Sequence, residues 1–202
     1  MKLKKLAQVC KKTRCITIFE KTEEGTGYVE QQYISDGYAV YPVYGLPVLD
    51  REALLTIFDI EHSKWDDWTV SRRPAPDSRY INLEDYDETE IPVRHLFPPV
   101  IYRDRQLMLC DLGDGEILMV DSDYLEPVSD GISREFYVRT GENGRKVLAV
   151  KDGLMLTAVI LPMSLQHSDQ VFELAGEFSR MGRALGNLAE KRRAAEGEQT
   201  EL

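Results

Sequence analysis

Apolar residues recur at helical spacing over the first fourteen positions, and the lysines among them fall mostly on the opposite side. The apolar side consists of Leu3, Leu6, Ala7, Val9 and Cys10. Runs rich in β-branched and aromatic residues follow at 15–20, 28–35 and 38–43. Asp36-Gly37 separates the last two runs, and this pair is typical of a hairpin turn whose two central residues have positive φ. The pattern predicts a short amphipathic helix followed by a three-stranded meander.

Regular patterns continue on both sides of an irregular middle segment. Asp50 is a candidate N-cap, because apolar residues follow it at helical spacing and predict a helix over 51–59. Runs at 105–111 and 116–121 predict a hairpin. Between these elements, 71–99 holds five of the nine prolines and a cluster of acidic residues. We expect an irregular, solvated connection there, with an acidic functional site as the alternative.

The C-terminal half repeats the order of the N-terminal half. A helix-compatible piece at 122–131 precedes strand-like runs at 135–140, 146–151 and 154–163, and Asp152-Gly153 separates the last two. Strand, glycine-containing turn, strand, Asp-Gly and strand thus occur twice. Two pseudo-repeated halves account for this order, and chance similarity between two meanders is the alternative.

A long amphipathic helix is predicted near the C-terminus, with Ser168 as a candidate N-cap. Its apolar positions follow the a/d spacing of a helix that packs along one seam. The seam consists of Val171, Leu174, Phe178, Met181, Leu185 and Leu188. It would pack on the sheet of the same chain or, alternatively, on the same helix of a second chain, giving a homo-oligomer. Beyond Glu190 the apolar stripe is lost, and we expect the tail to fray.

These patterns predict an α+β fold with two pseudo-repeated antiparallel meanders, short helices and a long C-terminal helix. A single domain would span 1–163, with halves 1–70 and 100–163 joined by the connection 71–99. The C-terminal helix would span 164–190, and 191–202 would be a disordered tail.

Charge and cysteine content indicate which ligands and which cellular compartment suit this protein. The formal net charge of −10 argues against a surface that binds polyanions everywhere, but it leaves room for a local basic face. The three cysteines, Cys10, Cys15 and Cys110, show no metal-binding or redox spacing, which favours buried free thiols in a reducing compartment. The basic N-terminus lacks the continuous apolar stretch of a signal peptide or membrane span. We expect a cytoplasmic protein without membrane contact.

The order of elements resembles that of the DNA sliding clamps. A helix leads into a three-stranded run twice, YLEPVSDG precedes the second run, and the last strand ends in AVILPM at 158–163. The resemblance implies a clamp-like fold in which helices line a DNA-facing surface. The chain departs from that pattern in its long proline-rich middle, its terminal helix and the absence of a strand pattern before the first helix. The sequence also resembles uncharacterised prophage-borne proteins of Gram-positive gut bacteria.

A clamp-like module would bind double-stranded DNA through phosphate contacts rather than base recognition. The first fourteen residues carry six basic side chains and no acidic one, which gives the candidate nucleic-acid-binding set Lys2, Lys4, Lys5, Lys11, Lys12 and Arg14. A solvated helix face is the alternative interpretation of these lysines. The helix-compatible piece of the second half is acidic, which weakens the clamp mechanism.

Signals for catalysis are sparse. His62, His95 and His167 are far apart in sequence, and none lies in a nucleophile or metal motif. The acidic residues from Asp111 to Asp123 are typical of turns and do not match a calcium loop, although a cation site there stays open. The sequence predicts no catalytic residues, no metal and no cofactor. We expect a non-catalytic binding or assembly module that acts through surface contacts, and the resemblances imply a phage-derived, DNA-clamp-like one; the alternative is an enzyme with a site assembled between the two halves.

Overall fold

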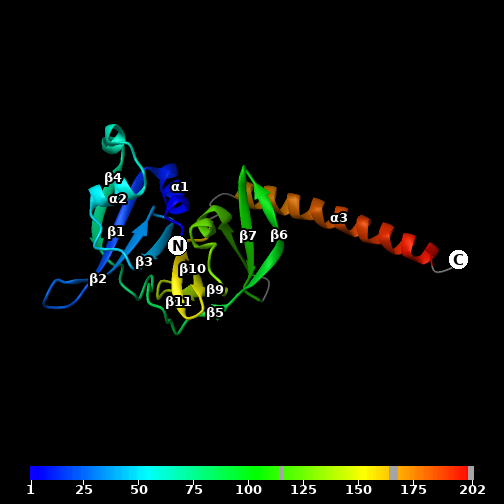
Figure 1. The fold of residues 1–202 in the computed structure, drawn as a ribbon. Helices are drawn as coiled ribbons and strands as arrows, with labels where there is room; N and C mark the ends of the chain where they lie inside the picture. The colour runs from blue at the N-terminus through cyan, green and yellow to red at the C-terminus, as the bar shows by residue number, and fades with distance from the viewer. Residues whose placement is uncertain (114–115, 164–167, 200–202) are drawn as a thin grey trace. The chain divides into compact units, whose positions relative to one another are not determined.

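The computed structural model describes residues 1–113, 116–163 and 168–199, and Figure 1 labels most of its helices and strands. The chain divides into two compact units, Met1–Met163 and Ser164–Leu202. The first unit combines helices with largely antiparallel sheets, and the second contains one long helix. The predicted α+β class is therefore confirmed.

The first half of unit one contains three helical segments and four strands. They are α1 (Leu3–Thr13), β1 (Cys15–Thr22), β2 (Val29–Ser35), β3 (Ala39–Val43), α2 (Arg51–Ile57), the 3-10 helix η1 (His62–Asp67) and β4 (Thr69–Pro74). The predicted N-cap is confirmed, because Asp50 accepts a hydrogen bond from the backbone N–H of Ala53 at 2.8 Å.

The rest of unit one adds seven strands and a second 3-10 helix. They are β5 (Ile91–Pro92), β6 (Arg94–Tyr102), β7 (Arg105–Asp111), β8 (Ile117–Asp121), η2 (Ser122–Val128), β9 (Arg134–Thr140), β10 (Lys146–Asp152) and β11 (Met155–Ile160). Strands β6, β7 and β8 form a separate antiparallel sheet, so the predicted hairpin at 105–121 gains a third strand.

The two meanders join into one eight-stranded sheet, in the order β4-β1-β2-β3-β11-β10-β9-β5 (Figure 1). Strands β3 and β11 meet antiparallel at the centre, where Val40 pairs with Val159 and Ala39 with Ile160. The six central strands have the same order when counted from either end, as an approximate twofold axis between β3 and β11 requires. The edge strands break this symmetry, because β4 runs parallel to β1 whereas β5 runs antiparallel to β9.

The helical segments that lead into the two meanders, α1 and η2, lie side by side and antiparallel. The backbone N–H of Lys2, at the start of α1, donates to the carbonyl of Pro127 near the end of η2. At the other end of α1, Lys12 forms an ion pair with Asp123 near the start of η2. The helices therefore follow the same approximate twofold relation as the strands they precede.

Side chains of the large sheet alternate between two cores, as the period of two in a strand requires. On β10, Leu148 and Val150 belong to a large core that includes residues of α1, α2 and the three-stranded sheet. Val147 and Ala149 belong to a smaller core on the other face, where Leu83 packs against them. Both faces of the sheet are thus covered, and β10 is almost continuously apolar for this reason.

Both predicted hairpins form with Asp-Gly at the tip, but the turn chemistry differs from the expectation. Only the glycines adopt positive φ, with Gly37 at 96° and Gly153 at 61°. The aspartates instead act through their side chains. Asp36 Oδ1 accepts hydrogen bonds from the backbone N–H groups of the two residues after Gly37, and Asp152 Oδ1 accepts one from Ser133. The prediction that both central residues have positive φ was therefore wrong: Asp36 caps backbone donors of its own turn, and Asp152 accepts from the residue before β9.

The segment 71–99 is irregular only in its middle, because β4, β5 and β6 occupy its ends. Its acidic residues fasten it to the sheet rather than pointing only to solvent. Asp85 accepts a hydrogen bond from the backbone N–H of Leu156 at 2.7 Å, and Glu84 pairs with Lys21 at 2.7 Å. Fixed acceptors of this kind explain how a proline-rich segment without long strands covers one face of the sheet.

Glu90 attaches the segment through two buried cations. Arg139, 2% exposed, donates to Glu90 Oε1 from Nη2 at 2.6 Å and from Nε at 3.0 Å, and its Nη1 donates to the carbonyl of Asn82. Lys151, 8% exposed, approaches Glu90 Oε2 to 3.1 Å. One carboxylate thus compensates two buried cations. Arg139 projects from β9 and Lys151 from the adjacent strand β10.

In unit two, α3 spans Ser168–Gln199 and confirms the predicted C-terminal helix. The proposed N-cap of Ser168 falls outside the described side chains. The helix continues past Glu190, where the sequence suggested fraying, to Gln199. Alanine, lysine, arginine and glutamate dominate this last part and have high helix propensity, so loss of the apolar stripe does not end the helix.

We predict that Glu90→Gln lowers the free energy of unfolding by about 3–5 kcal/mol, because Arg139 and Lys151 would remain buried without a counter-charge. Urea denaturation followed by circular dichroism measures the change. The matched control is Glu88→Gln on the same segment, where the side chain is exposed and a change of less than about 0.5 kcal/mol is expected. Equal stability of the two variants would contradict the role given to Glu90.

Candidate functional site

The surface formed by α1 and η2 carries the basic residues that the sequence singled out. Four of them are engaged by neighbouring polar or acidic groups. Lys2 Nζ donates to Ser129 Oγ at 2.8 Å, and Lys5 Nζ lies 3.2 Å from a carboxylate oxygen of Glu126. Lys12 pairs with Asp123, as described above, and Arg14 pairs with Asp67 at 3.8 Å. Acidic residues of η2 therefore offset the charges of Lys5 and Lys12, and Asp67 of η1 offsets that of Arg14.

Lys4 and Lys11 complete the predicted set, and both are exposed. Within residues 1–113, 116–163 and 168–199, neither forms an ion pair. Lys11 and Arg14 line a cavity of about 370 Å³ whose other charged walls include Lys64, Asp59 and Glu61. This mixture of charges gives the cavity no clear preference for an anion or a cation.

A shallow groove follows the contact between α1 and η2. It has a volume of about 350 Å³ and is lined by Lys5, Gln8, Val9, Lys12, Asp123 and Glu126. Its ion pairs are exposed, and exposed pairs contribute only about 0–1 kcal/mol each. A partner with suitable charges could therefore replace them at little cost. The groove can bind a polar surface, but its lining does not enclose a small molecule.

A buried polar cluster lies beneath this surface, where the two halves meet. Asp36 is 5% exposed, and its Oδ2 makes no hydrogen bond of good geometry among the described residues. Burial raises the pKa of Tyr124, and the nearby charge of Asp36 raises it further. Tyr41 is raised in pKa by the same two causes and donates its hydroxyl to the carbonyl of Tyr124 at 2.8 Å. Sequence reasoning treated Asp36 only as a turn residue and missed this cluster.

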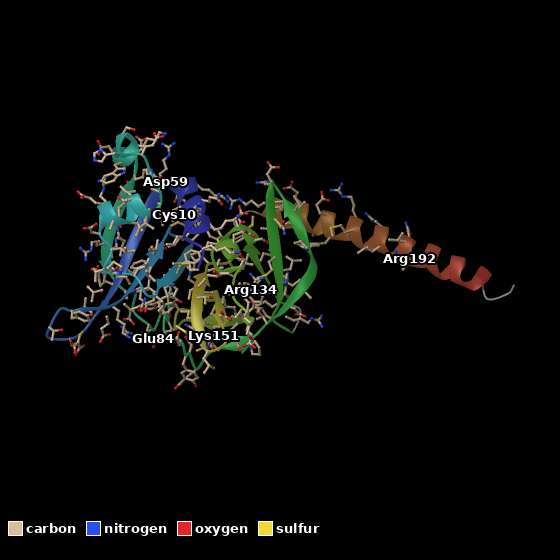
Figure 2. The ribbon with its side chains drawn as sticks, viewed as in Figure 1. Cys10, Asp59, Glu84, Arg134, Lys151 and Arg192 are labelled. Atoms are coloured by element: carbon tan, nitrogen blue, oxygen red, sulfur yellow. The ribbon has the colours of Figure 1, made fainter. Side chains whose placement is uncertain are left out.

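Cys10 and Cys110 are buried as expected, but the expectation of a buried thiol is wrong for Cys15, which is exposed at the start of β1. Burial raises the pKa of Cys10 well above its usual range, and the charge of Asp36 adds to the effect. Burial alone raises the pKa of Cys110 to about 11. Both buried thiols therefore stay protonated at neutral pH, which makes them poor nucleophiles. In Figure 2, Cys10 is labelled on α1.

The histidines have separate structural surroundings. His62 packs on Trp65 in η1, with ring centroids 4.4 Å apart. His95 belongs to β6 and meets the ring of Phe136 edge-on, with centroids 6.2 Å apart. Burial lowers the pKa of His95, as does the positive charge of Arg134. His167 lies outside the described residues. The structure thus gives the two described histidines aromatic packing partners.

The acidic residues between 111 and 123 serve the turns at the ends of β7 and β8. Asp111 accepts a hydrogen bond from the backbone N–H of Gly113 at 2.9 Å, and Asp121 accepts one from Asp123 at 3.0 Å. Asp114 lies outside the described residues. In the described part of the chain, no three side chains of the metal-binding types converge on one point.

The predicted seam of α3 is exposed toward its C-terminal end. Leu174 is buried, Phe178 and Met181 are half-buried, and Leu185 and Leu188 are 56% and 51% exposed. Val171 falls outside the described side chains. The last two leucines thus present apolar surface to solvent.

No protein-family model, curated protein or solved structure matches this chain. The resemblances to sliding clamps and to prophage-borne proteins therefore stay predictions. Among the helices in the described residues, none is both long enough and apolar enough to cross a membrane.

We predict that one thiol per chain reacts rapidly with a disulfide reagent at pH 8, because only Cys15 is exposed and the other two are buried and protonated. Absorbance of the released thiolate measures the count, and all three thiols should react in denaturant. Cys15→Ser should remove the rapid phase. Rapid reaction of this variant would show that Cys10 or Cys110 is accessible.

Proposed function

We propose that this chain is a non-catalytic binding and assembly module whose contact surface is the face formed by α1 and η2. One observation carries the proposal: the two meanders are arranged about an approximate twofold axis that brings their leading helices together on one face of a continuous sheet. A rigid sheet that displays two adjacent helices suits recognition of an extended partner. Function then depends on surface charge and shape rather than on a reactive group.

Double-stranded DNA is the ligand that the clamp resemblance implies, and the charges define how it would bind. Lys4 and Lys11 are available for phosphate contacts, whereas Lys5 and Lys12 would first have to leave Glu126 and Asp123. Binding would therefore be weak, independent of base sequence and strongly reduced by salt.

The chemistry at the junction of the halves supports a binding role over the alternative of an enzyme site there. Cys10, Tyr41 and Tyr124 all have raised pKa values because they are buried. A nucleophile or general base requires the opposite shift for these groups.

We predict that removing the acidic partners strengthens DNA binding. Asp123→Asn combined with Glu126→Gln frees Lys5 and Lys12, and affinity for a short duplex at low salt should rise by about tenfold or more, with a steeper salt dependence. Fluorescence anisotropy with a labelled duplex measures both. Lys4→Glu combined with Lys11→Glu should lower the affinity of the unmodified chain by a similar factor.

The control for charge is Glu24→Gln combined with Glu88→Gln, which makes the same change in net charge at exposed positions outside the α1–η2 surface. It should leave binding nearly unchanged. If neither the unmodified chain nor the Asp123→Asn, Glu126→Gln variant retains duplex at low salt, DNA is not the ligand of this surface.

A further inference from the structure

We propose that 75–90 is a releasable strap, which lifts from the large sheet as a unit while the sheet itself stays folded. The strap lies between β4 and β5. It covers the face of the sheet opposite α1, where Leu83 packs against β10. The strap therefore acts on a face of the sheet that the proposed function does not use.

The strap has few apolar anchors. Among its residues, all of which the structure describes, only Leu83 is buried. Ala75 and Ile81 are half-buried and pack on the same small core, whereas Tyr80 and Tyr86 are 46% and 70% exposed. A segment with so little buried apolar surface has a low free energy of local opening.

The hydrogen bonds that hold the strap are unlike those of a strand in a sheet. None of its residues belongs to a helix or strand, and the carbonyl of Asp77 accepts from the backbone N–H of Tyr80 within the strap itself. Three backbone N–H groups outside the strap, here called the strap amides, donate to its acceptors: Leu156 to Asp85 Oδ1 at 2.7 Å, Thr140 to Thr89 Oγ1 at 3.0 Å and Glu142 to the Arg79 carbonyl at 2.8 Å. Water can replace these acceptors when the strap lifts.

Charge holds the strap closed and also limits the cost of opening it. The strap carries six acidic residues and one basic residue. Its Glu84 pairs with Lys21 of β1. Its Glu90 pairs with Arg139 and Lys151. Opening separates these pairs but returns Arg139 and Lys151 to water, which recovers the free energy that their burial costs. The open state therefore contains no unpaired buried cation from these pairs.

Both ends of the strap have attachments that its opening leaves intact. At the first end, the backbone N–H of Ala75 donates to the carbonyl of Glu20 at 2.8 Å. At the other end, β5 pairs with β9 through Ile91 and Val138. Opening therefore uncovers the small core without separating any strands. The uncovered side chains belong to β2, β10 and β11, and they are Tyr33, Val147, Ala149, Leu156 and Val159.

Native-state hydrogen exchange, measured by NMR on the unmodified chain, tests the strap directly. We expect the strap amides to share one opening equilibrium constant, about 100-fold or more larger than that of amides in the centre of β10, with little dependence on urea. Amides of β10 should respond steeply to urea, since they exchange only on global unfolding. A single opening equilibrium and urea dependence for both sets would overturn the proposal, because the strap would then open only when the sheet unfolds.

A glycine substitution displaces the strap. A Cβ added at Gly141 would lie 2.4 Å from the carbonyl oxygen of Tyr80, so Gly141→Ala forces the strap away from the turn between β9 and β10. The matched control is Gly131→Ala, because the nearest atoms there belong to the side chain of Asp152, 3.3 Å away and outside the strap.

We expect Gly141→Ala to speed exchange of the strap amides by about tenfold or more, while circular dichroism still reports a folded sheet. Gly131→Ala should leave exchange of the strap amides nearly unchanged. Loss of the folded sheet in Gly141→Ala, or equal exchange of the strap amides in the two variants, would show that 75–90 is a fixed part of the fold and not a strap that opens.

Discussion

The antiparallel pairing of β3 with β11 is the constraint on which the first unit depends. Only two residue pairs define its ladder, and the backbone N–H of Leu161 adds a hydrogen bond to the carbonyl of Tyr38 at 2.8 Å. This short contact turns two meanders into one sheet. Because each meander is preceded by a helical segment, the same pairing also brings α1 beside η2 and buries Asp36 between the halves. The candidate surface and the polar cluster below it follow from one strand junction.

The second constraint is the covering of the opposite face of the sheet. Arg139 and Lys151 point to this face from β9 and β10, where an uncompensated charge would oppose folding. Glu90 compensates both, and it directly precedes β5, which pairs with β9. The buried cations therefore select the position of this segment. This network of Glu90, Arg139 and Lys151 fixes the position of the segment more than it adds to the free energy of unfolding. The cost of removing the charged groups from water cancels most of the free energy that their attraction supplies.

Local patterns predicted the elements well, because each depends on nearby residues. The amphipathic spacing of α1, the Asp50 cap and the two Asp-Gly hairpins are all short-range signals. The role of Glu90 could not be predicted in this way, because its partners lie 49 and 61 positions away and no local pattern links them. The candidate site also combines a feature that local sequence predicts with one that depends on distant residues. The basic character of α1 was evident in the sequence, but its neutralisation by Asp123 and Glu126 depends on the fold.

The two halves agree in backbone order but differ in charge, and this difference bears on function. In a DNA-facing surface made of paired helices, both helices should carry positive charge. Here α1 is basic, whereas η2 and the turn after it present Asp123, Glu126 and Asp130, which meet Lys12, Lys5 and the N-terminal amino group. The surface is therefore self-complementary across the approximate axis. A partner must compete with these internal pairs, so it must offer both signs of charge or a high density of one. A protein surface with mixed charge meets the first condition, and a nucleic acid at low salt meets the second.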